Sequence, residues 1–289
     1  MEFKFNFRKP EGEINEWLSS GNDEVNNHAE RLQKEENIRK FVEVIPNNSL
    51  KIEGDKYKIN NLRVGDCFLS YISSEDIQSD TLDTIQLANK DHSDLIPGIY
   101  EGGLKIWECT LDLINYLQEN DIVKKGMNIL DLGCGAGLAG IFAYLKGANV
   151  DFQDYNEEVL RHLTIKNVLL NVNEQMTEVP KLCRFFAGDW KSIHDHFNKI
   201  FLECPKYDII LTSETIYNPA NQQDLLQLMK TTLKSNGRIY LAAKTYYFGV
   251  GGGLRQFEEE VGKEGVFTAE VCQVFNIGVQ REIILLQFR

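Results

Sequence analysis

Residues 128–140 read Asn-Ile-Leu-Asp-Leu-Gly-Cys-Gly-Ala-Gly-Leu-Ala-Gly, and this stretch decides the fold. Its first half predicts a short apolar strand that ends in an acid, Asp131. Three closely spaced glycines, Gly133, Gly135 and Gly137, predict a sharp turn, after which a helix begins near Leu138. Because glycine has no side chain, such a turn lets the backbone approach a bound ligand closely. The stretch therefore predicts a loop that binds a nucleotide cofactor.

Two cofactors compete for this loop. Gly135, Gly137 and Gly140 have the spacing of a dinucleotide-binding turn, a pattern that is weakly specific by itself. Asp131 favours another ligand, because a carboxylate repels a pyrophosphate and attracts a cation. S-adenosylmethionine carries an ammonium and a sulfonium and no phosphate. A second acid, Asp154, follows about twenty residues later and can accept both ribose hydroxyls. The remaining alternative is a tight turn that binds no ligand.

The composition of the chain limits its class and its partners. A length of 289 residues suits one large domain with an extension, or two small domains. The net charge of -12 argues against nonspecific binding of nucleic acid and is compatible with a basic protein partner. Six cysteines without a Cys-x-x-Cys pair favour a reduced compartment over a structural zinc site, and we expect no bound metal. We find no apolar run of membrane-spanning length and no secretory signal. These features predict a protein of the cytosol, the nucleus or both, including the nucleolus.

The pattern of apolar residues predicts an α/β fold. Helical spacing appears at 104–117, and strands and helices alternate after it. Strands are predicted at 128–132, 149–152, 183–187, 207–212 and 238–243, and helices at 138–145, 157–170, 190–201, 222–233 and 254–263. Two last strands, 266–274 and 280–288, form a hairpin. We therefore expect a Rossmann-like, seven-stranded and mostly parallel sheet with helices on both faces and an antiparallel hairpin at its end.

The N-terminal third has a different composition. Residues 1–40 are rich in Asn, Glu and Lys and are predicted to be a flexible segment, with a solvated helix at 24–39 as an alternative. Residues 41–94 are predicted to form a small β-rich extension and linker, with strands at 41–45, 50–52, 57–59 and 67–72. The domain that carries the glycine loop is then expected to span 95–289.

Five polar or glycine-rich patches fall where predicted strands end or helices begin. They are 102–110, 131–137, 153–155, 188–190 and 213–218. At the carboxyl edge of one sheet they would line a single crevice. Asp189-Trp190 suits an adenine, through the acid and the stacked ring, or equally a helix cap with a core tryptophan. A further segment, 246–253, carries three aromatics and four glycines, and is either a lid or an elaborate turn. His194 and His196 are interpreted as a solvated helix face, because no carboxylate-histidine set accompanies them.

With these residues in view, the chain resembles the histidine protein methyltransferases of the seven-β-strand, S-adenosylmethionine-dependent superfamily. The matching segments are 100–110, 131–135, 152–156, 211–219 and 247–253. The resemblance covers about 90–289, and it implies methyl transfer to a ring nitrogen, the tele nitrogen, of a histidine in a large-subunit ribosomal protein. Together with Asp131 and Gly135 of the glycine turn, the residues expected at the cofactor are Ile106, Trp107, Glu108, Cys109, Thr110, Gly133, Gln153, Asp154, Tyr155, Gly188, Asp189, Trp190 and Ser213.

The expected chemistry needs no strong base, because a neutral imidazole with a pKa of about 6.5 is already nucleophilic. The protein must align one ring nitrogen and fix the tautomer by holding the other ring N–H. Glu214 is predicted for that task, and Tyr217 and Asn218 are predicted to position the ring. The segment 213–217 replaces the Asp-x-x-Tyr type motif of related lysine methyltransferases, which weakens the lysine alternative.

Four alternatives stay open at this point. They are a lysine or small-molecule methyltransferase, a non-catalytic ribosomal-protein chaperone that binds cofactor, a nicotinamide oxidoreductase, and methylation of His92 in cis, where an ordinary loop histidine is the simpler interpretation. We expect the chain to be a monomer with a basic protein substrate.

Overall fold

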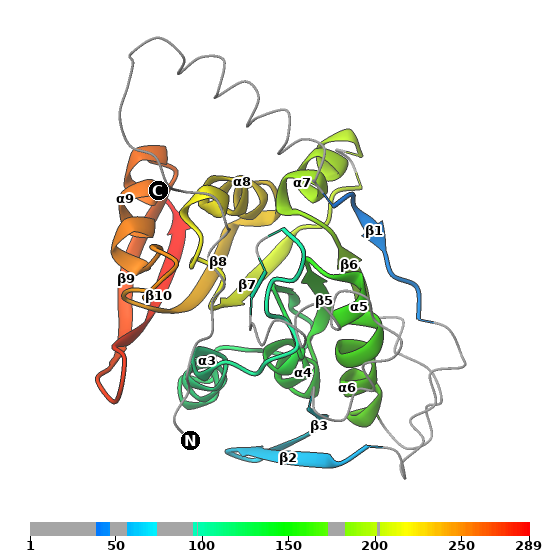
Figure 1. The fold of residues 1–289 in the computed structure, drawn as a ribbon. Helices are drawn as coiled ribbons and strands as arrows, with labels where there is room; N and C mark the ends of the chain where they lie inside the picture. Colours follow the sequence, from blue (N-terminus) through cyan, green and yellow to red (C-terminus); the bar gives the residue numbers. More distant parts are fainter. Residues whose placement is uncertain (1–38, 47–56, 74–94, 97, 173–182, 201–202) are drawn as a thin grey trace, which may run out of the picture.

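The computed structural model describes residues 39–46, 57–73, 95–96, 98–172, 183–200 and 203–289. Eight strands form one sheet in the order β1-β6-β5-β4-β7-β8-β10-β9 (Figure 1). They are β1 (Val42–Glu43), β4 (Asn128–Leu132), β5 (Asn149–Asp154), β6 (Cys183–Ala187), β7 (Tyr207–Ser213), β8 (Leu233–Lys244), β9 (Phe267–Phe275) and β10 (Arg281–Phe288). The five strands from β6 to β8 run parallel, and each of the other pairings is antiparallel. The expected fold class is confirmed, and β1 adds a short edge strand to it.

Helices cover both faces of the sheet (Figure 1). One layer holds α3 (Glu108–Glu119), α4 (Leu138–Leu145), and a continuous helical stretch made of α5 (Glu157–Val159), the π turn η3 (Leu160–Thr164) and α6 (Ile165–Leu170). The other holds α7 (Trp190–Lys199), the short η4 (Pro219–Asn221), α8 (Gln222–Thr232) and α9 (Leu254–Glu264). Successive residues of β4 belong to different cores, Ile129 to the first and Leu130 to the second. This alternation is what a strand buried on both faces requires.

The topology places a crevice at the carboxyl end of β4. The chain runs outward from β4 to β5 and β6, and then returns to β7 on the other side of β4. Loops that leave β4 and β7 therefore diverge, as at the ligand-binding switch point of other open α/β sheets.

The N-terminal hairpin packs on the domain that carries the glycine loop. The strands β2 (Ile59–Val64) and β3 (Cys67–Ile72) pair antiparallel, and Leu69 and Ile72 are buried in the same core as α4 and α6. Asn167 of α6 accepts the backbone N–H of Ile72 at 2.9 Å. The predicted strand 57–59 is wrong in extent, because pairing with β3 carries the strand through the polar Asn60 and Asn61 to Val64.

Other boundaries differ by less. The strand predicted at 238–243 begins at Leu233, directly after α8, because Leu233 pairs with Tyr207 across a register shift. The edge strand predicted at 41–45 pairs only at Val42 and Glu43. The predictions for 1–38, the strand 50–52, His92 and the end of the helix 190–201 fall outside the described residues.

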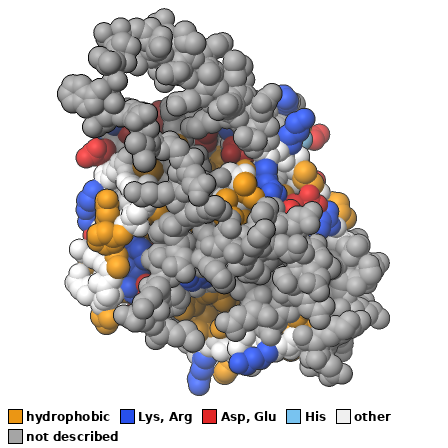
Figure 2. Space-filling view, viewed as in Figure 1, with side chains coloured by type: hydrophobic (Ala, Val, Ile, Leu, Met, Phe, Trp, Pro, Cys, Tyr) orange, Lys and Arg blue, Asp and Glu red, His pale blue; other side chains and the backbone are white. Residues whose placement is uncertain are grey.

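No helix in the described part of the chain is long and apolar enough to cross a bilayer. Where the described surface is visible in Figure 2, basic, acidic and hydrophobic side chains are interspersed. The net charge of -12 is thus not gathered in one acidic patch on the part of this face that is described.

Gly140, in α4 directly after the glycine loop, packs closely against the sheet. A Cβ on Gly140 would lie 2.3 Å from Cε1 of the buried Phe152 and 3.0 Å from Asp131. We expect Gly140→Ala to destabilise the protein by about 1–3 kcal/mol, as overpacking does. Gly262 of α9 is the matched control, because a Cβ there meets nothing within 4 Å.

Chemical denaturation of both variants checks this prediction. Gly262→Ala should be neutral or stabilising by up to about 1 kcal/mol, since alanine favours a helix. Equal unfolding free energies for the two variants would contradict the close packing at Gly140.

Candidate functional site

A pocket lies at the carboxyl edge of β4, β5 and β7. Its wall combines the glycine loop, the turn before α3 and the loops after β5, β6 and β7. It is lined by Glu101, Gly102, Gly103, Lys105, Ile106, Trp107, Thr110, Gly133, Cys134, Gly135, Ala136, Leu138, Asp154, Tyr155, Asp189, Trp190, Ser213, Glu214, Thr215, Tyr217 and Asn221. Four of these described residues are acids and one is a lysine. The five patches predicted from the sequence therefore meet in one pocket.

The end of β5 connects three of these loops through two side chains. Asp154 accepts the N–H of Gly135 at 2.9 Å and the N–H of Asn156 at 3.1 Å. Gln153, which is 1% exposed, accepts the N–H of Gly133 at 3.2 Å. The same amide oxygen of Gln153 accepts the indole N–H of Trp190, and its amide group donates to the carbonyl of Gly188. Gln153 thus acts behind the wall, whereas Asp154 is part of it.

Burial raises the pKa values of two acids near strand ends, Asp131 of β4 and Asp154 of β5. It raises the pKa of Asp154 to about 6, against hydrogen bonds from Asn156 and Gly135 that lower it. It raises the pKa of Asp131 to about 7, and the charge of Asp154 raises it further. Asp131 does not line the pocket but accepts the N–H of Gly140 at 2.8 Å, near the N-terminus of α4. Its negative charge therefore lies behind the glycine loop and stabilises the start of that helix.

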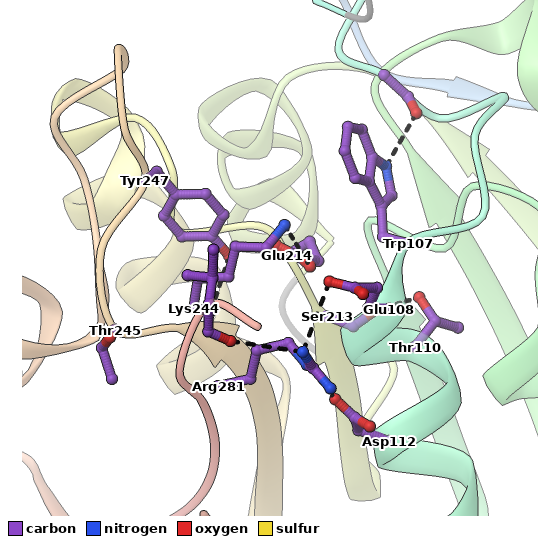
Figure 3. A network of polar contacts seen from close by, with 12 residues as sticks. Trp107, Glu108, Thr110, Asp112, Ser213, Glu214, Lys244, Thr245, Tyr247 and Arg281 are labelled. Carbon is purple, nitrogen blue, oxygen red and sulfur yellow. Dashed lines mark hydrogen bonds and ion pairs between the residues drawn. The ribbon is translucent and has the colours of Figure 1, made fainter. Parts of the chain in front are cut away.

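The start of α3 forms the opposite wall. Trp107 donates its indole N–H to the carbonyl of Gly102 at 3.2 Å, and the Thr110 and Ser213 hydroxyls are 2.8 Å apart. Cys109 points into the core and is fully buried. Glu108 lies 3.6 Å from Arg281, which also binds Asp112 at 2.6 Å (Figure 3). The helix therefore presents Trp107 and Thr110 to the pocket, but neither Glu108 nor Cys109 lines it.

Asp189 and Trp190 combine both roles predicted for them. Asp189 is the N-cap of α7 and accepts the N–H of Lys191 at 2.9 Å. Both residues also line the pocket, whereas Gly188 does not. The capping contact therefore leaves both residues at the wall of the pocket.

The loop after β7 brings the predicted catalytic residues together in part. Tyr217 donates its hydroxyl hydrogen to Glu101, and both line the pocket. Burial raises the pKa of Tyr217 well above its usual value, and the charge of Glu101 raises it further. Asn218 instead caps η4, accepting the N–H of Ala220 at 3.0 Å. Glu214 lines the pocket with a backbone φ of +59°, a conformation that is strained for a residue other than glycine.

Glu214 is paired with Lys244, a residue that no sequence pattern singled out. The side chains of Glu214 and Lys244 are 4% and 3% exposed, and their charged atoms lie 3.2 Å apart. Lys244 ends β8, beside Ser213 at the end of β7 (Figure 3). Neither carboxylate oxygen of Glu214 has a hydrogen-bond partner among the described residues. The carboxylate therefore pairs with Lys244 and lies beside the Cys109 thiol and the Tyr247 phenol, which leaves several of its lone pairs open.

Several lining residues were not predicted. Glu101, Leu138 and Asn221 line the pocket but fall outside the five predicted patches, whereas six others fall inside the patches without having been selected singly: Gly102, Gly103, Lys105, Cys134, Ala136 and Thr215. Glu101 and Gly103 stand in the segment 100–110 that carries the family resemblance, so their position was a usable signal. Gly103 packs closely against Asp154, whose oxygens lie 3.0 and 3.1 Å from a Cβ built on it. The role of each selected residue stays a prediction, because position at the wall does not establish contact with a ligand.

The remaining motifs lie elsewhere. His196 stacks on Phe41 with ring centroids 3.9 Å apart, and His194 lies near Asn198 on the same helix. Among the described residues no group of three or more His, Cys, Asp and Glu could hold a metal ion. The segment 246–253 forms a hydrogen-bonded turn in which Tyr247 is buried, and the N–H of Gly252 binds the carbonyl of Tyr217 at 3.0 Å.

Comparisons with known proteins agree with this geometry. A protein-family model described as "Lysine methyltransferase" matches residues 98–248, just over half of the chain. The "Histidine protein methyltransferase 1 homolog" of Dictyostelium discoideum is 50% identical over 169 residues, which cover 58% of this chain and 52% of that protein. The protein of the same description from Rattus norvegicus is 43% identical over 220 residues, 68% of this chain and 60% of that one. The chain spans about half to three fifths of the length of these curated relatives.

A solved SAM-dependent methyltransferase from Agrobacterium tumefaciens aligns with a TM-score of 0.49 and 12% identity, over 80% of this chain and 70% of that one. The resemblance predicted from the motifs is confirmed by the two relatives. The chain therefore belongs to the methyltransferase family that the model describes, and within it is similar to histidine protein methyltransferases.

Proposed function

We propose that this protein transfers a methyl group from S-adenosylmethionine to a ring nitrogen of a histidine in another protein. The observation that carries the proposal is a single pocket whose acidic wall also includes Glu214, a buried carboxylate paired with Lys244. Membership in a methyltransferase family and similarity to histidine protein methyltransferases support the same activity.

The residues present fit S-adenosylmethionine better than a dinucleotide. Asp154 and Trp190 line the pocket, and a carboxylate and an indole ring suit the hydroxyls of a ribose and the ring of an adenine. Glu101 and Glu214 place two further carboxylates in the pocket, which suits an ammonium and a sulfonium and repels a pyrophosphate. When bound, this cofactor supplies an electrophilic methyl group.

The protein's task is alignment and charge stabilisation. Glu214 would accept the pros N–H of a neutral imidazole, so that the tele nitrogen presents its lone pair to the methyl carbon. Methyl transfer from the bound cofactor would leave the positive charge on the imidazole ring. The carboxylate of Glu214 then stabilises that charge. The buried Tyr217, fixed by Glu101, would limit the ring's orientation.

We infer that the target is a basic protein, a ribosomal protein of the large subunit, methylated at the tele nitrogen. The net charge of -12 supports a basic partner. Lysine methylation is the second candidate, because the matching family model carries that description.

Mass spectrometry of large-subunit ribosomal proteins from cells that lack this chain tests the substrate. We expect one histidine-containing peptide to lose 14 Da relative to control cells, the mass of one CH2 group. An unchanged set of methylated histidines together with a lost methyllysine would favour the second candidate.

The raised pKa of Asp154 makes cofactor affinity dependent on pH. A carboxylate with a pKa of about 6 accepts hydroxyls best when ionised, so affinity for S-adenosylhomocysteine should fall as pH falls through 6. At pH 5, one unit below this pKa, about one tenth of the Asp154 carboxyl groups are ionised. The affinity for S-adenosylhomocysteine should therefore be about tenfold lower at pH 5 than at pH 7.5. Asp154→Asn should weaken binding at pH 7.5 by about tenfold and flatten this dependence.

Calorimetric titration at several pH values measures both effects. Asp208→Asn is the control, because Asp208 binds Lys234 at the opposite edge of the sheet. A wild-type affinity that does not change between pH 7.5 and 5 would remove Asp154 from the cofactor contact.

Glu214→Gln should separate catalysis from binding. We expect turnover to fall by about 100-fold, the loss typical of one stabilising group at a developing charge, with S-adenosylhomocysteine affinity changed by less than about twofold. Glu282→Gln is the matched control, since Glu282 is buried in β10 and binds Arg255 instead. Turnover rates and cofactor titrations decide this, and unchanged turnover in Glu214→Gln would exclude the assigned role.

A further inference from the structure

The Lys244 side chain is a buried ammonium behind the wall of the pocket. It is 3% exposed, and its ammonium lies over the rings of Trp107 and Tyr247, 5.5 and 5.7 Å from their centroids. Its opposite charge is Glu214, 3.2 Å away. Lys244 itself does not line the pocket, whereas Trp107 and Glu214 do. A buried ammonium one residue layer behind the wall acts on a ligand only through these neighbours.

The other groups that face Glu214 are neutral. Burial raises the pKa of the Cys109 thiol on α3 and of the Tyr247 phenol after β8 well above their usual values, and the negative charge of Glu214 adds to both shifts. Cys109 and Tyr247 therefore stay protonated at neutral pH. Arg281 is bound by Asp112 and Glu108 in the adjoining network (Figure 3). Lys244 is thus the cation that balances Glu214 among the groups described around it.

We propose that Lys244 is a positioning residue for histidine methylation: its ammonium keeps the Glu214 carboxylate ionised and oriented, so that the free acceptor capacity of the carboxylate faces the substrate imidazole. The inference rests on the proposed function for its catalytic consequence. Its electrostatic part stands on the structure alone.

The physical reason lies in how the carboxylate is held. Among the described residues the buried Glu214 carboxylate has one charged partner, the Lys244 ammonium, and otherwise faces the weak or neutral donors Cys109 and Tyr247, so the ion pair is its main compensation for burial. A hydrogen-bonded arginine fork would occupy both oxygens, whereas one ammonium leaves acceptor sites open. Glu214 also holds a left-handed backbone conformation, with φ at +59°, at a cost in local strain.

Removing the ammonium should leave the buried Glu214 carboxylate without an opposite charge. In Lys244→Met the buried carboxylate loses the opposite charge that normally lowers its pKa by about 1–3 units. Below the raised pKa the carboxyl group is neutral and no longer stabilises the imidazolium. We expect the acidic limb of the pH–rate profile to move upward by at least about one unit, and Lys244→Arg to restore part of the wild-type profile.

This profile is measured from initial rates with tritium-labelled S-adenosylmethionine. The substrate is a set of large-subunit ribosomal proteins from cells that lack the chain, and the labelled methylhistidine is counted after hydrolysis. In the double variant Glu214→Gln/Lys244→Met the titrating group is gone, so the remaining activity should follow the wild-type midpoint. Lys146→Met is the matched control, because Lys146 pairs with the exposed Asp66. A packing role for Lys244 would lower the rate without moving the midpoint, and that result would overturn the proposal.

Thermal unfolding tests the same pair without any substrate. In Lys244→Met the buried Glu214 carboxylate has lost its opposite charge, and ionising an unpaired buried acid opposes folding, so the variant should lose stability as pH rises. Its melting temperature should fall further below wild type at pH 8 than at pH 5, and the difference should not depend on pH in the double variant. An equal deficit at both pH values in the single variant would overturn the proposal. Failure of the wild type to form methylhistidine would instead refute the proposed function, and the unfolding series would still decide the role of Lys244.

Discussion

The site depends on two adjacent side chains at the end of β5. Gln153 and Asp154 receive the backbone N–H groups of Gly133 and Gly135, and Gln153 also binds the carbonyl of Gly188 and the indole of Trp190. The loops after β4 and β6 are therefore fixed to the strand between them. A residue without these donors and acceptors would leave buried backbone groups unpaired, each at about 1–3 kcal/mol. The glycines that bend the β4 loop make this close contact with β5 sterically allowed.

The same arrangement buries two acids, Asp131 and Asp154, near enough for the charge of one to affect the other. Asp131 and Asp154 have pKa values raised to about 7 and about 6, mainly by burial. For acids with raised folded-state pKa values, folding stability declines as pH rises from their unfolded value of about 3.9 to these values. The pocket is therefore a region where stability is lowered near neutral pH. Binding of a cationic cofactor there would recover part of that energy, because opposite charge favours the ionised acids.

Much of the fold followed from the sequence because each parallel strand is apolar and bounded by turn residues. The strands Asn128–Leu132 and Cys183–Ala187 and the helix Leu138–Leu145 have their predicted limits. The hairpin strand Ile59–Val64 was only partly predicted, because its polar residues are ordered by pairing with β3 rather than by their own pattern. In the site, the sequence predicted which residues lie at strand ends. It did not predict which side chains at the start of α3 face the pocket. The pattern around Trp107 could not show that Cys109 faces the core and Glu108 faces Arg281. Lys244 was missed because its partner Glu214 is distant in sequence.

Glu214 links the structure to the chemistry, because it is strained and buried, lines the pocket and pairs with Lys244. The side chain proposed to be modified there is an imidazole. The most direct measurement is amino-acid analysis of protein labelled by the purified chain with S-adenosyl-[methyl-³H]methionine. The account predicts radioactivity in tele-methylhistidine, and radioactivity in methyllysine alone would contradict it.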